Sequence, residues 1–141
     1  MFEKAAKSEP VLDVALEFAD AINRQNMADL AKLMSKNHVF VDSLGSVVEG
    51  REKMEQGWAA YFRMVPDYMV MIEETYAHGP VVVMLGTARG TYTRDGKLLP
   101  ENKWQTPAAW RATVQNGQVT EWRVYADNEP IRRLMADGLR Q

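Results

Sequence analysis

The chain has 141 residues, of which 46% are apolar and 26% charged, a composition typical of one domain with a buried core. Its net charge of −2 without a basic stripe argues against nucleic acid as a partner, and the lack of cysteine excludes disulfides and thiol nucleophiles. The two histidines show no metal-ligand spacing and no apolar run is long enough to cross a membrane. We therefore expect a cytoplasmic protein with neither a metal nor another cofactor and no membrane partner.

Helical patterns fill the first part of the chain. Residues 1–7 are predicted to be an N-terminal tail, followed by a single domain at residues 8–141. Ser8, two residues before a proline, is typical of a helix start, and apolar residues then recur at helical spacing as far as Gln25: Val11, Ala15, Phe18 and Ile22. A second, short helix is predicted to begin at Asn26, a typical cap, with an apolar face made of Leu30, Leu33 and Met34.

A short strand is expected at residues 39–42, where apolar and polar residues alternate. Strand side chains alternate between faces, so His38, Phe40 and Asp42 share one face, and Phe40 is expected to face the core. Asp42 then points the same way, and an inward carboxylate is costly unless it is paired, protonated or in a wet cavity. The pattern next predicts a turn at 44–46, a short extended segment at 47–48 and a third helix at 50–64.

The second half of the chain is predicted to be mostly strand, at residues 68–78, 81–93, 104–115 and 118–126. Gly86 and Gly90 inside one of these strands indicate bulges or bends, so the sheet is expected to be strongly curved. The dipeptide Asn116-Gly117 is the clearest hairpin signal of the sequence. Asp127 or Asn128 then caps a final helix with the apolar residues Ile131, Leu134, Met135 and Leu139.

Helices followed by hairpin-linked strands are typical of an α+β fold. We predict a cone-shaped domain in which three N-terminal helices pack in a strongly curved antiparallel sheet, with a C-terminal helix after the last strand. The open end of such a cone is a natural ligand cavity.

With this order of elements, the sequence resembles the SnoaL-like and ketosteroid isomerase-like branch of the nuclear transport factor 2-like superfamily. The likeness covers nearly the whole domain and rests on the order and spacing of several segments: residues 22–42, Leu44-Gly45, Glu49-Gly50, Pro66-Asp67-Tyr68, Thr106-Pro107-Ala108-Ala109-Trp110 and residues 121–127. It implies the cone-shaped fold and a homodimer formed through the open face of the sheet. It implies less about activity, because this fold hosts many functions.

The resemblance gives Asp42 a candidate role, since it falls where ketosteroid isomerases hold their general-base aspartate. Such a base moves a proton between two carbons of an enolisable ketone. The alternative is that Asp42 caps the turn at residues 43–45, as aspartate often does. The sequence leaves both interpretations open.

Two acids that these isomerases use to bind the enolate oxygen are missing from this chain. The tyrosine position on the first helix falls on Phe18, and the late aspartate position falls on Trp110, or on Ala109 if the following loop is counted differently. The Trp110 indole N–H still offers one hydrogen-bond donor. Because losing one oxyanion donor typically costs about 100- to 1000-fold in rate, the sequence argues against a steroid isomerase.

Asp127 looks like the acid at the end of the last strand in SnoaL-like cyclases, where an aspartate serves as acid or base in an aldol ring closure. It also directly precedes a helix, so capping is the alternative. Asp42 and Asp127 would form an acid–base pair if both faced one cavity.

Aromatic residues are the candidate walls of that cavity. Trp58 matches a pocket-lining position of the isomerases, and the other candidates are Phe18, Phe40, Tyr61, Trp110, Trp122 and Tyr125. The hydroxyls of Tyr61 and Tyr125 are candidates for orienting a substrate oxygen. Core packing is the alternative for these aromatic residues.

We therefore expect a protein that binds a small hydrophobic, carbonyl-bearing molecule in an apolar pocket. If it is an enzyme, we expect a cofactor-free isomerase or cyclase with Asp42 as base. The alternative is a non-catalytic ligand-binding or dimeric interaction module, which the missing acids favour. A limonene-type epoxide hydrolase, with its aspartate–arginine–aspartate set, is a further alternative, although no convincing Arg-x-Asp spacing supports it.

Overall fold

The structure is a computed structural model that describes residues 10–140, with side chains described as far as residue 137. The tail predicted at residues 1–7 and the helix start predicted at Ser8 lie outside the described residues, as does the side chain of Leu139. Within the described range, no helix is both long enough and apolar enough to span a membrane.

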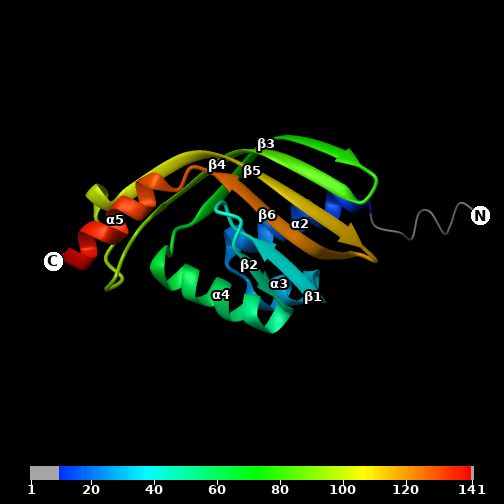
Figure 1. Cartoon of the computed structure of the whole chain (residues 1–141), viewed down its shortest axis with the longest axis horizontal. Coiled ribbons are helices and arrows are strands. Elements are labelled where there is room, and N and C mark those ends of the chain that lie inside the picture. Colours follow the sequence, from blue (N-terminus) through cyan, green and yellow to red (C-terminus); the bar gives the residue numbers. More distant parts are fainter. Residues whose placement is uncertain (1–9, 141) are drawn as a thin grey trace, which may run out of the picture.

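Four α-helices and six strands make up the described part of the chain (Figure 1). The helices are α2 (Val11–Arg24), α3 (Met27–Leu33), α4 (Arg51–Met64) and α5 (Glu129–Arg140). The strands are β1 (Met34–Val41), β2 (Val47–Glu49), β3 (Met69–His78), β4 (Val81–Thr91), β5 (Lys103–Gln115) and β6 (Gln118–Ala126), with a short 3-10 helix, η1 (Pro100–Asn102), before β5.

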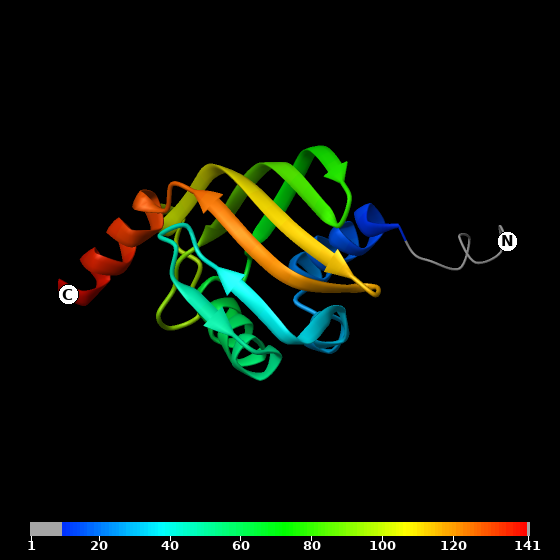
Figure 2. The ribbon, with the colours of Figure 1, turned by 45° about the vertical axis from the view of Figure 1, so that its right-hand side comes forward.

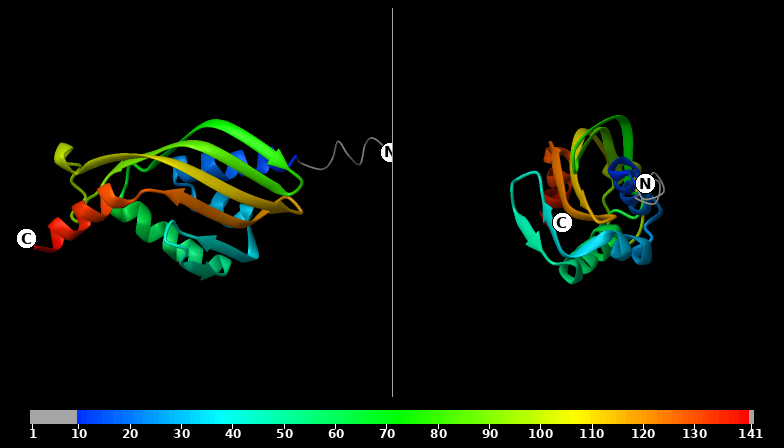
Figure 3. Two further views of the ribbon diagram at one scale, coloured as in Figure 1. Left: turned by 45° about the horizontal axis from the view of Figure 1, so that its top comes forward. Right: turned by 90° about the vertical axis from the view of Figure 1, so that its right-hand side faces the viewer.

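The strands form one sheet in the order β2-β1-β6-β5-β4-β3. This sheet curls around the N-terminal helices without closing on itself, and the end-on view of Figure 3 shows α2 inside the curl. Helix α4 lies across the remaining opening, and α5 extends from the end of β6 (Figure 1). The predicted α+β cone is confirmed.

The sheet differs from the prediction at β1. This strand is antiparallel to β2 but parallel to β6, so the sheet contains one parallel pair. It also begins at Met34, which the apolar pattern had assigned to the second helix. Met34 is fully buried, and an apolar residue at the junction of two elements fits the period of either one, so the pattern could not place the boundary.

Two glycines permit the curvature of the sheet. Strand β3 has a bulge just after Ile72, where its register against β4 shifts. At that point a Cβ built on Gly86 would lie 1.8 Å from the Met71 carbonyl oxygen. A Cβ on Gly90 would lie 2.3 Å from Cγ1 of Val65. Each glycine predicted to mark a bend therefore stands where a neighbour comes too close for any side chain.

Asn23 ties the first helix to the free edge of the sheet. Its amide nitrogen donates to the Val70 carbonyl oxygen at 2.9 Å, and its oxygen accepts from the Val70 N–H at 2.7 Å. The Asn23 side chain thus pairs with the backbone of the edge strand β3, where a further strand could otherwise bind. This contact covers part of an edge that would be open to pairing with another chain.

His38 lies on the inner face of β1 and is part of the core. Its ring lies 5.9 Å from the Phe18 ring, centroid to centroid, and its Nδ1 lies 2.7 Å from the Val119 carbonyl oxygen, to which the N–H donates. Burial lowers the pKa of His38 below its ordinary value of 6.5, so the imidazole is held neutral. The inward orientation predicted for His38 is confirmed.

Acidification should therefore destabilise the fold. As the pH falls below about 6.5, the unfolded chain binds a proton at His38 that the folded chain takes up only at lower pH. The free energy of unfolding from urea titrations should decrease between about pH 7.5 and about pH 5.5. His38→Gln should flatten this decrease, whereas the same change at the exposed His78 should preserve it. An equal slope in both variants would rule out the buried imidazole as the cause.

Gly86→Ala should be strongly destabilising, because the new methyl group would overlap the carbonyl of Met71 and force the backbone of β3 to move. We expect a loss of roughly 1–3 kcal/mol in the free energy of unfolding, measured by denaturant titration. The matched control is Gly57→Ala in α4, where the nearest atom to the new Cβ is the Met54 sulfur at 3.6 Å. Alanine in this helix should instead stabilise the protein by up to about 1 kcal/mol. Similar losses in both variants would contradict the close contact at Gly86.

Candidate functional site

A cavity of about 330 Å³ lies between α4 and the concave face of the sheet. The helix and the residues that follow it contribute Met54, Gly57, Trp58, Tyr61 and Tyr68. The strands contribute Phe40, Val48, Ala88, Trp104, Val124 and Ala126. The polar lining residues Asp42, Ser43 and Asn128 come from the turn after β1 and the start of α5, which lie side by side in Figure 2.

Four aromatic side chains form a continuous wall of this cavity: Trp58, Tyr61, Tyr68 and Trp104. The rings of Tyr61 and Tyr68 are nearly perpendicular with centroids 5.0 Å apart, and Tyr68 lies 6.1 Å from Trp104. Burial raises the pKa of both tyrosines, and the nearby Tyr68 adds to the rise at Tyr61. Both hydroxyls are therefore neutral at physiological pH and can act as hydrogen-bond donors.

Several donors around this wall lack an acceptor. The indole N–H groups of Trp58 and Trp104 are buried without a hydrogen-bond partner among the described residues. The nearby Trp110 side chain offsets part of the rise in the pKa of Tyr68. The neutral hydroxyl of Tyr68 keeps a hydrogen that it can donate to an acceptor.

Asp42 lines the cavity and also caps its own turn. Its Oδ1 accepts hydrogen bonds from the backbone N–H groups of Leu44 and Ser46, both at 2.9 Å. The backbone closes the same turn, with the Gly45 N–H donating to the Asp42 carbonyl oxygen at 2.9 Å. Within the described residues, no hydrogen bond is made by Oδ2. Capping explains these contacts, and the role of Asp42 as a base stays a prediction.

Asp127 does not join Asp42 at the cavity. It is exposed, and its Oδ1 accepts the N–H of Glu129 at 3.0 Å at the start of α5, which is a capping contact. Its neighbours Ala126 and Asn128 line the cavity, whereas Asp127 does not. The structure therefore does not bring the two predicted carboxylates into one site. Across residues 10–140, no three acidic or histidine side chains are grouped closely enough to hold a metal ion.

The predicted aromatic residues divide into two sets. Phe40, Trp58 and Tyr61 line the cavity. The other four lie outside its lining: Phe18, Trp110, Trp122 and Tyr125. Phe18 and Trp122 are fully buried and pack on each other with ring centroids 4.7 Å apart, so they belong to the core.

Tyr125 is on the wrong face of the sheet for a cavity residue. It is 47% exposed on the outer face, with the guanidinium of Arg123 5.2 Å from its ring centroid. Strand alternation explains this placement, because Val124 and Ala126 on either side face the cavity. Strict alternation along β6 was the sequence signal that would have excluded Tyr125.

Ten cavity residues were missing from the prediction, and the aromatic or polar ones among them are Ser43, Tyr68, Trp104 and Asn128. Trp104 could have been found, because it has the same parity on β5 as the inward-facing Trp110. Asn128 and Ser43 had no local signal. The Asn128 amide donates to the Ser43 hydroxyl oxygen at 2.8 Å and joins positions 85 residues apart.

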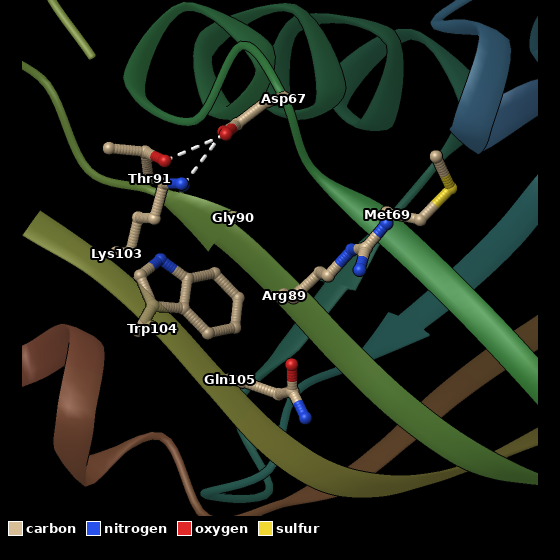
Figure 4. Close-up of a pocket in the computed structure, with 8 residues that line it drawn as sticks. All are labelled: Asp67, Met69, Arg89, Gly90, Thr91, Lys103, Trp104 and Gln105. Atoms are coloured by element: carbon tan, nitrogen blue, oxygen red, sulfur yellow. Dashed lines mark hydrogen bonds between the residues drawn. The ribbon is translucent and has the colours of Figure 1, made fainter. Parts of the chain in front are cut away.

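A wider depression of about 700 Å³ lies where β3 begins, and Trp104 lines it as well (Figure 4). There the carboxylate of Asp67 accepts the N–H and the hydroxyl of Thr91, both at 2.7 Å. Its other polar lining residues, Arg89, Lys103 and Gln105, are exposed. Ligand sites are usually enclosed and mostly apolar, so the cavity beneath the sheet is the better candidate.

Comparison with known proteins supports this architecture. The sequence model of the SnoaL-like domain family matches residues 15–122. No curated protein sequence shows a significant match. A proposed SnoaL-like polyketide cyclase from Shewanella denitrificans is 18% identical, with a TM-score of 0.77 over 90% of this chain and 97% of the other.

Two other solved structures give similar values. An LEH-like epoxide hydrolase from M. tuberculosis is 17% identical, with a TM-score of 0.74 over 92% of this chain and 91% of the other. IdmH, a proposed polyketide cyclase from Streptomyces antibioticus, is also 17% identical, with a TM-score of 0.74 over 91% and 99%. At such identities the likeness shows the fold alone, while the domain match covers most of this sequence. The chain therefore belongs to the SnoaL-like domain family.

Proposed function

We propose that this protein binds a small apolar molecule with a carbonyl oxygen in the cavity between α4 and the sheet. The observation that carries the proposal is the cavity wall, which combines apolar and aromatic side chains with hydrogen-bond donors and includes no cation. A volume of about 330 Å³ is at the small end of the range for ligand sites, which suits a molecule with a few fused rings.

The donors favour a ligand that offers an acceptor. The aromatic wall supplies the hydroxyls of Tyr61 and Tyr68, while the other polar side chains, Asp42, Ser43 and Asn128, come from the turn after β1 and the residue before α5. A buried donor without a partner, such as the indole N–H of Trp58 or Trp104, costs about 1–3 kcal/mol of free energy. A carbonyl oxygen that accepts a hydrogen bond from this wall would remove such a cost. Two of the similar structures are proposed polyketide cyclases, and polyketides are rich in carbonyl groups, which supports the same ligand class here.

A pair of ligands with the same shape tests this proposal. The ketone 2-acetylnaphthalene carries a carbonyl oxygen where 2-isopropenylnaphthalene carries a methylene group. We expect the ketone to bind about 3- to 10-fold more tightly, as one net hydrogen bond would give, in fluorescence titrations of the purified protein. Absence of binding by both compounds, or equal affinity for the two, would contradict a carbonyl-binding cavity.

Filling the cavity should remove binding. Ala126→Phe places a large ring into the cavity from the end of β6, and we expect at least about a 10-fold loss of affinity for 2-acetylnaphthalene. Ala109→Phe is the matched control, because Ala109 opposes Tyr125 on the outer face of the sheet. Thermal denaturation of both variants checks the fold. Comparable losses of affinity in the two folded variants would show that the ligand binds elsewhere.

A second candidate is cofactor-free acid–base catalysis, with Asp42 as the base. The position of Asp42 favours it, since the carboxylate lines the same cavity and its capping contacts use only Oδ1. In such a reaction Oδ2 would take a proton from the carbon next to the carbonyl, the electron pair would move to the carbonyl oxygen, and a proton would return to carbon. An epoxide hydrolase of the limonene type is less well supported, because the cavity lining contains no arginine.

Hydrogen–deuterium exchange tests this candidate without a known substrate. In deuterated water the protein should speed up deuteration of the methyl group of bound 2-acetylnaphthalene, followed by proton NMR. Asp42→Asn should lower the protein-dependent rate about 100-fold or more, because the amide oxygen can keep the turn contacts but cannot take the proton. Asp127→Asn, outside the cavity, should keep the rate. If the deuteration rate is unchanged in Asp42→Asn, Asp42 is not the base and its role is limited to capping the turn.

The homodimer implied by the family likeness also remains a proposal. Exposed large hydrophobic side chains on the sheet strands support it: Met71, Tyr76, Leu85 and Tyr125. These side chains would leave water if a second copy covered them.

A further inference from the structure

The non-aromatic polar residues of the cavity are gathered in one place. They are Asp42, Ser43 and Asn128, and they come from the turn after β1 and from the residue before α5, two segments that lie side by side in Figure 2. The rest of the lining is apolar or aromatic. A ligand in the cavity therefore meets a single polar cluster in an otherwise apolar and aromatic wall.

Asn128 directly precedes α5, where a side chain usually caps the helix. The capping contact is made by Asp127 instead, whose Oδ1 accepts the N–H of Glu129 at 3.0 Å. The backbone at this point is fixed, because the hydroxyl of the buried Thr106 donates to the Asp127 carbonyl oxygen at 2.8 Å. The Asn128 amide is therefore not used for capping and is held beside the cavity.

Ser43 belongs to a turn that is also fixed by hydrogen bonds. The Asp42 carboxylate accepts the N–H groups of Leu44 and Ser46, and the Asp42 N–H donates to the Ser46 carbonyl oxygen at 3.0 Å. The Asn128 amide nitrogen then donates to the Ser43 hydroxyl oxygen at 2.8 Å. These contacts set the positions of both side chains in the absence of a ligand, so a molecule that binds to them does not have to order them first.

The contact between Ser43 and Asn128 leaves one donor and one acceptor unused. A serine hydroxyl that accepts a hydrogen bond still has its own hydrogen to donate, and an asparagine amide that donates still has an oxygen that can accept. Across the described part of the chain, neither of these two groups makes a further hydrogen bond. Turning the amide over only exchanges the roles of the two residues, so the pair offers one donor and one acceptor in either orientation.

A hydroxyl group is the ligand chemistry that matches this pair, because its single oxygen both donates and accepts. A carboxylate does not match, since it only accepts, and the cavity lining contains the carboxylate of Asp42 but no cation. An apolar group does not match either, because it would cover the donor and the acceptor without replacing their hydrogen bonds to water.

We propose that Ser43 and Asn128 form a subsite for a hydroxyl group of the ligand. The ligand hydroxyl donates to the Asn128 amide oxygen, and its oxygen accepts the hydrogen of the Ser43 hydroxyl. This inference rests on the proposed function and narrows the ligand class to hydroxylated carbonyl compounds. It leaves Oδ2 of Asp42 available, so it holds with or without catalysis by that residue.

Two ketones with the same ring system test the subsite. The compound 6-acetyl-2-naphthol carries a hydroxyl group where 2-acetyl-6-methylnaphthalene carries a methyl group of similar size. We expect the wild type to bind the hydroxyl compound at least about 3-fold more tightly, in fluorescence titrations of the purified protein. Without the subsite the order should be the reverse, because a hydroxyl group that enters an apolar cavity loses its hydrogen bonds with water.

Ser43→Ala should abolish the preference for the hydroxyl compound and keep the affinity for the methyl compound, since only a hydroxyl is removed. Asn128→Leu, which removes the acceptor, should have the same effect. Ser46→Ala is the matched control and should keep the preference, because Ser46 lies in the same turn but outside the cavity lining. Thermal denaturation checks the fold of each variant, and if Asn128→Leu does not fold, the result for Ser43→Ala decides.

The outcomes separate the subsite from the proposed function. If the wild type prefers 2-acetylnaphthalene over 2-isopropenylnaphthalene but gains nothing from the hydroxyl group, the carbonyl-binding function stands and the subsite is overturned. A preference that survives in folded Ser43→Ala, or that is lost in Ser46→Ala as well, also overturns it. So does an equal loss of affinity for both ketones in Ser43→Ala, which would show that the contact only stabilises the cavity. If the wild type binds none of the four compounds, the proposed function fails and the subsite fails with it.

Discussion

The close approach of β3 to Gly86 is the contact on which the shape of the site depends. The bulge after Ile72 brings the Met71 carbonyl so near to β4 that only a glycine fits beneath it. The sheet can therefore bend over α2 instead of lying flat on it, and Asn23 fixes the helix to the edge strand at the same end. Away from the buried core, the curved sheet leaves the cavity of about 330 Å³, and residues of α4 line it from the other side.

The size of the inward-facing side chains decides how much of this space remains empty. Ala88 and Ala126 line the cavity with only one methyl group each, whereas Trp104 and Phe40 line it with large rings. Toward the core the inward residues of β5 and β6 become Trp110 and Trp122, which are almost fully buried and leave no room. The same strands thus build a packed core at one end and a cavity at the other, through small side chains in place of large ones.

The sequence predicted the elements well because their signals are local. Asn116 and Gly117 both have positive φ, at 53° and 74°, as the hairpin signal requires, and the bending glycines stand where the pattern placed them. The parallel pairing of β1 with β6 was not predictable, since it joins distant segments and leaves no periodic trace. The site was predicted less well for the same reason. Strand parity could have rejected Tyr125 and found Trp104, but the contact of Ser43 with Asn128 exists only in the folded chain.

Capping and a position in the cavity are compatible for Asp42. The two amide contacts use one oxygen and fix the plane of the carboxylate relative to the turn, while the residue still lines the cavity. What the cavity lacks is a second carboxylate, because Asp127 is used to cap α5. The buried tyrosines Tyr61 and Tyr68 stay protonated in the same cavity, because burial raises their pKa. A neutral phenol can donate a hydrogen bond to a carbonyl oxygen without becoming charged, so both tyrosines can serve as donors in a cavity that has a single carboxylate.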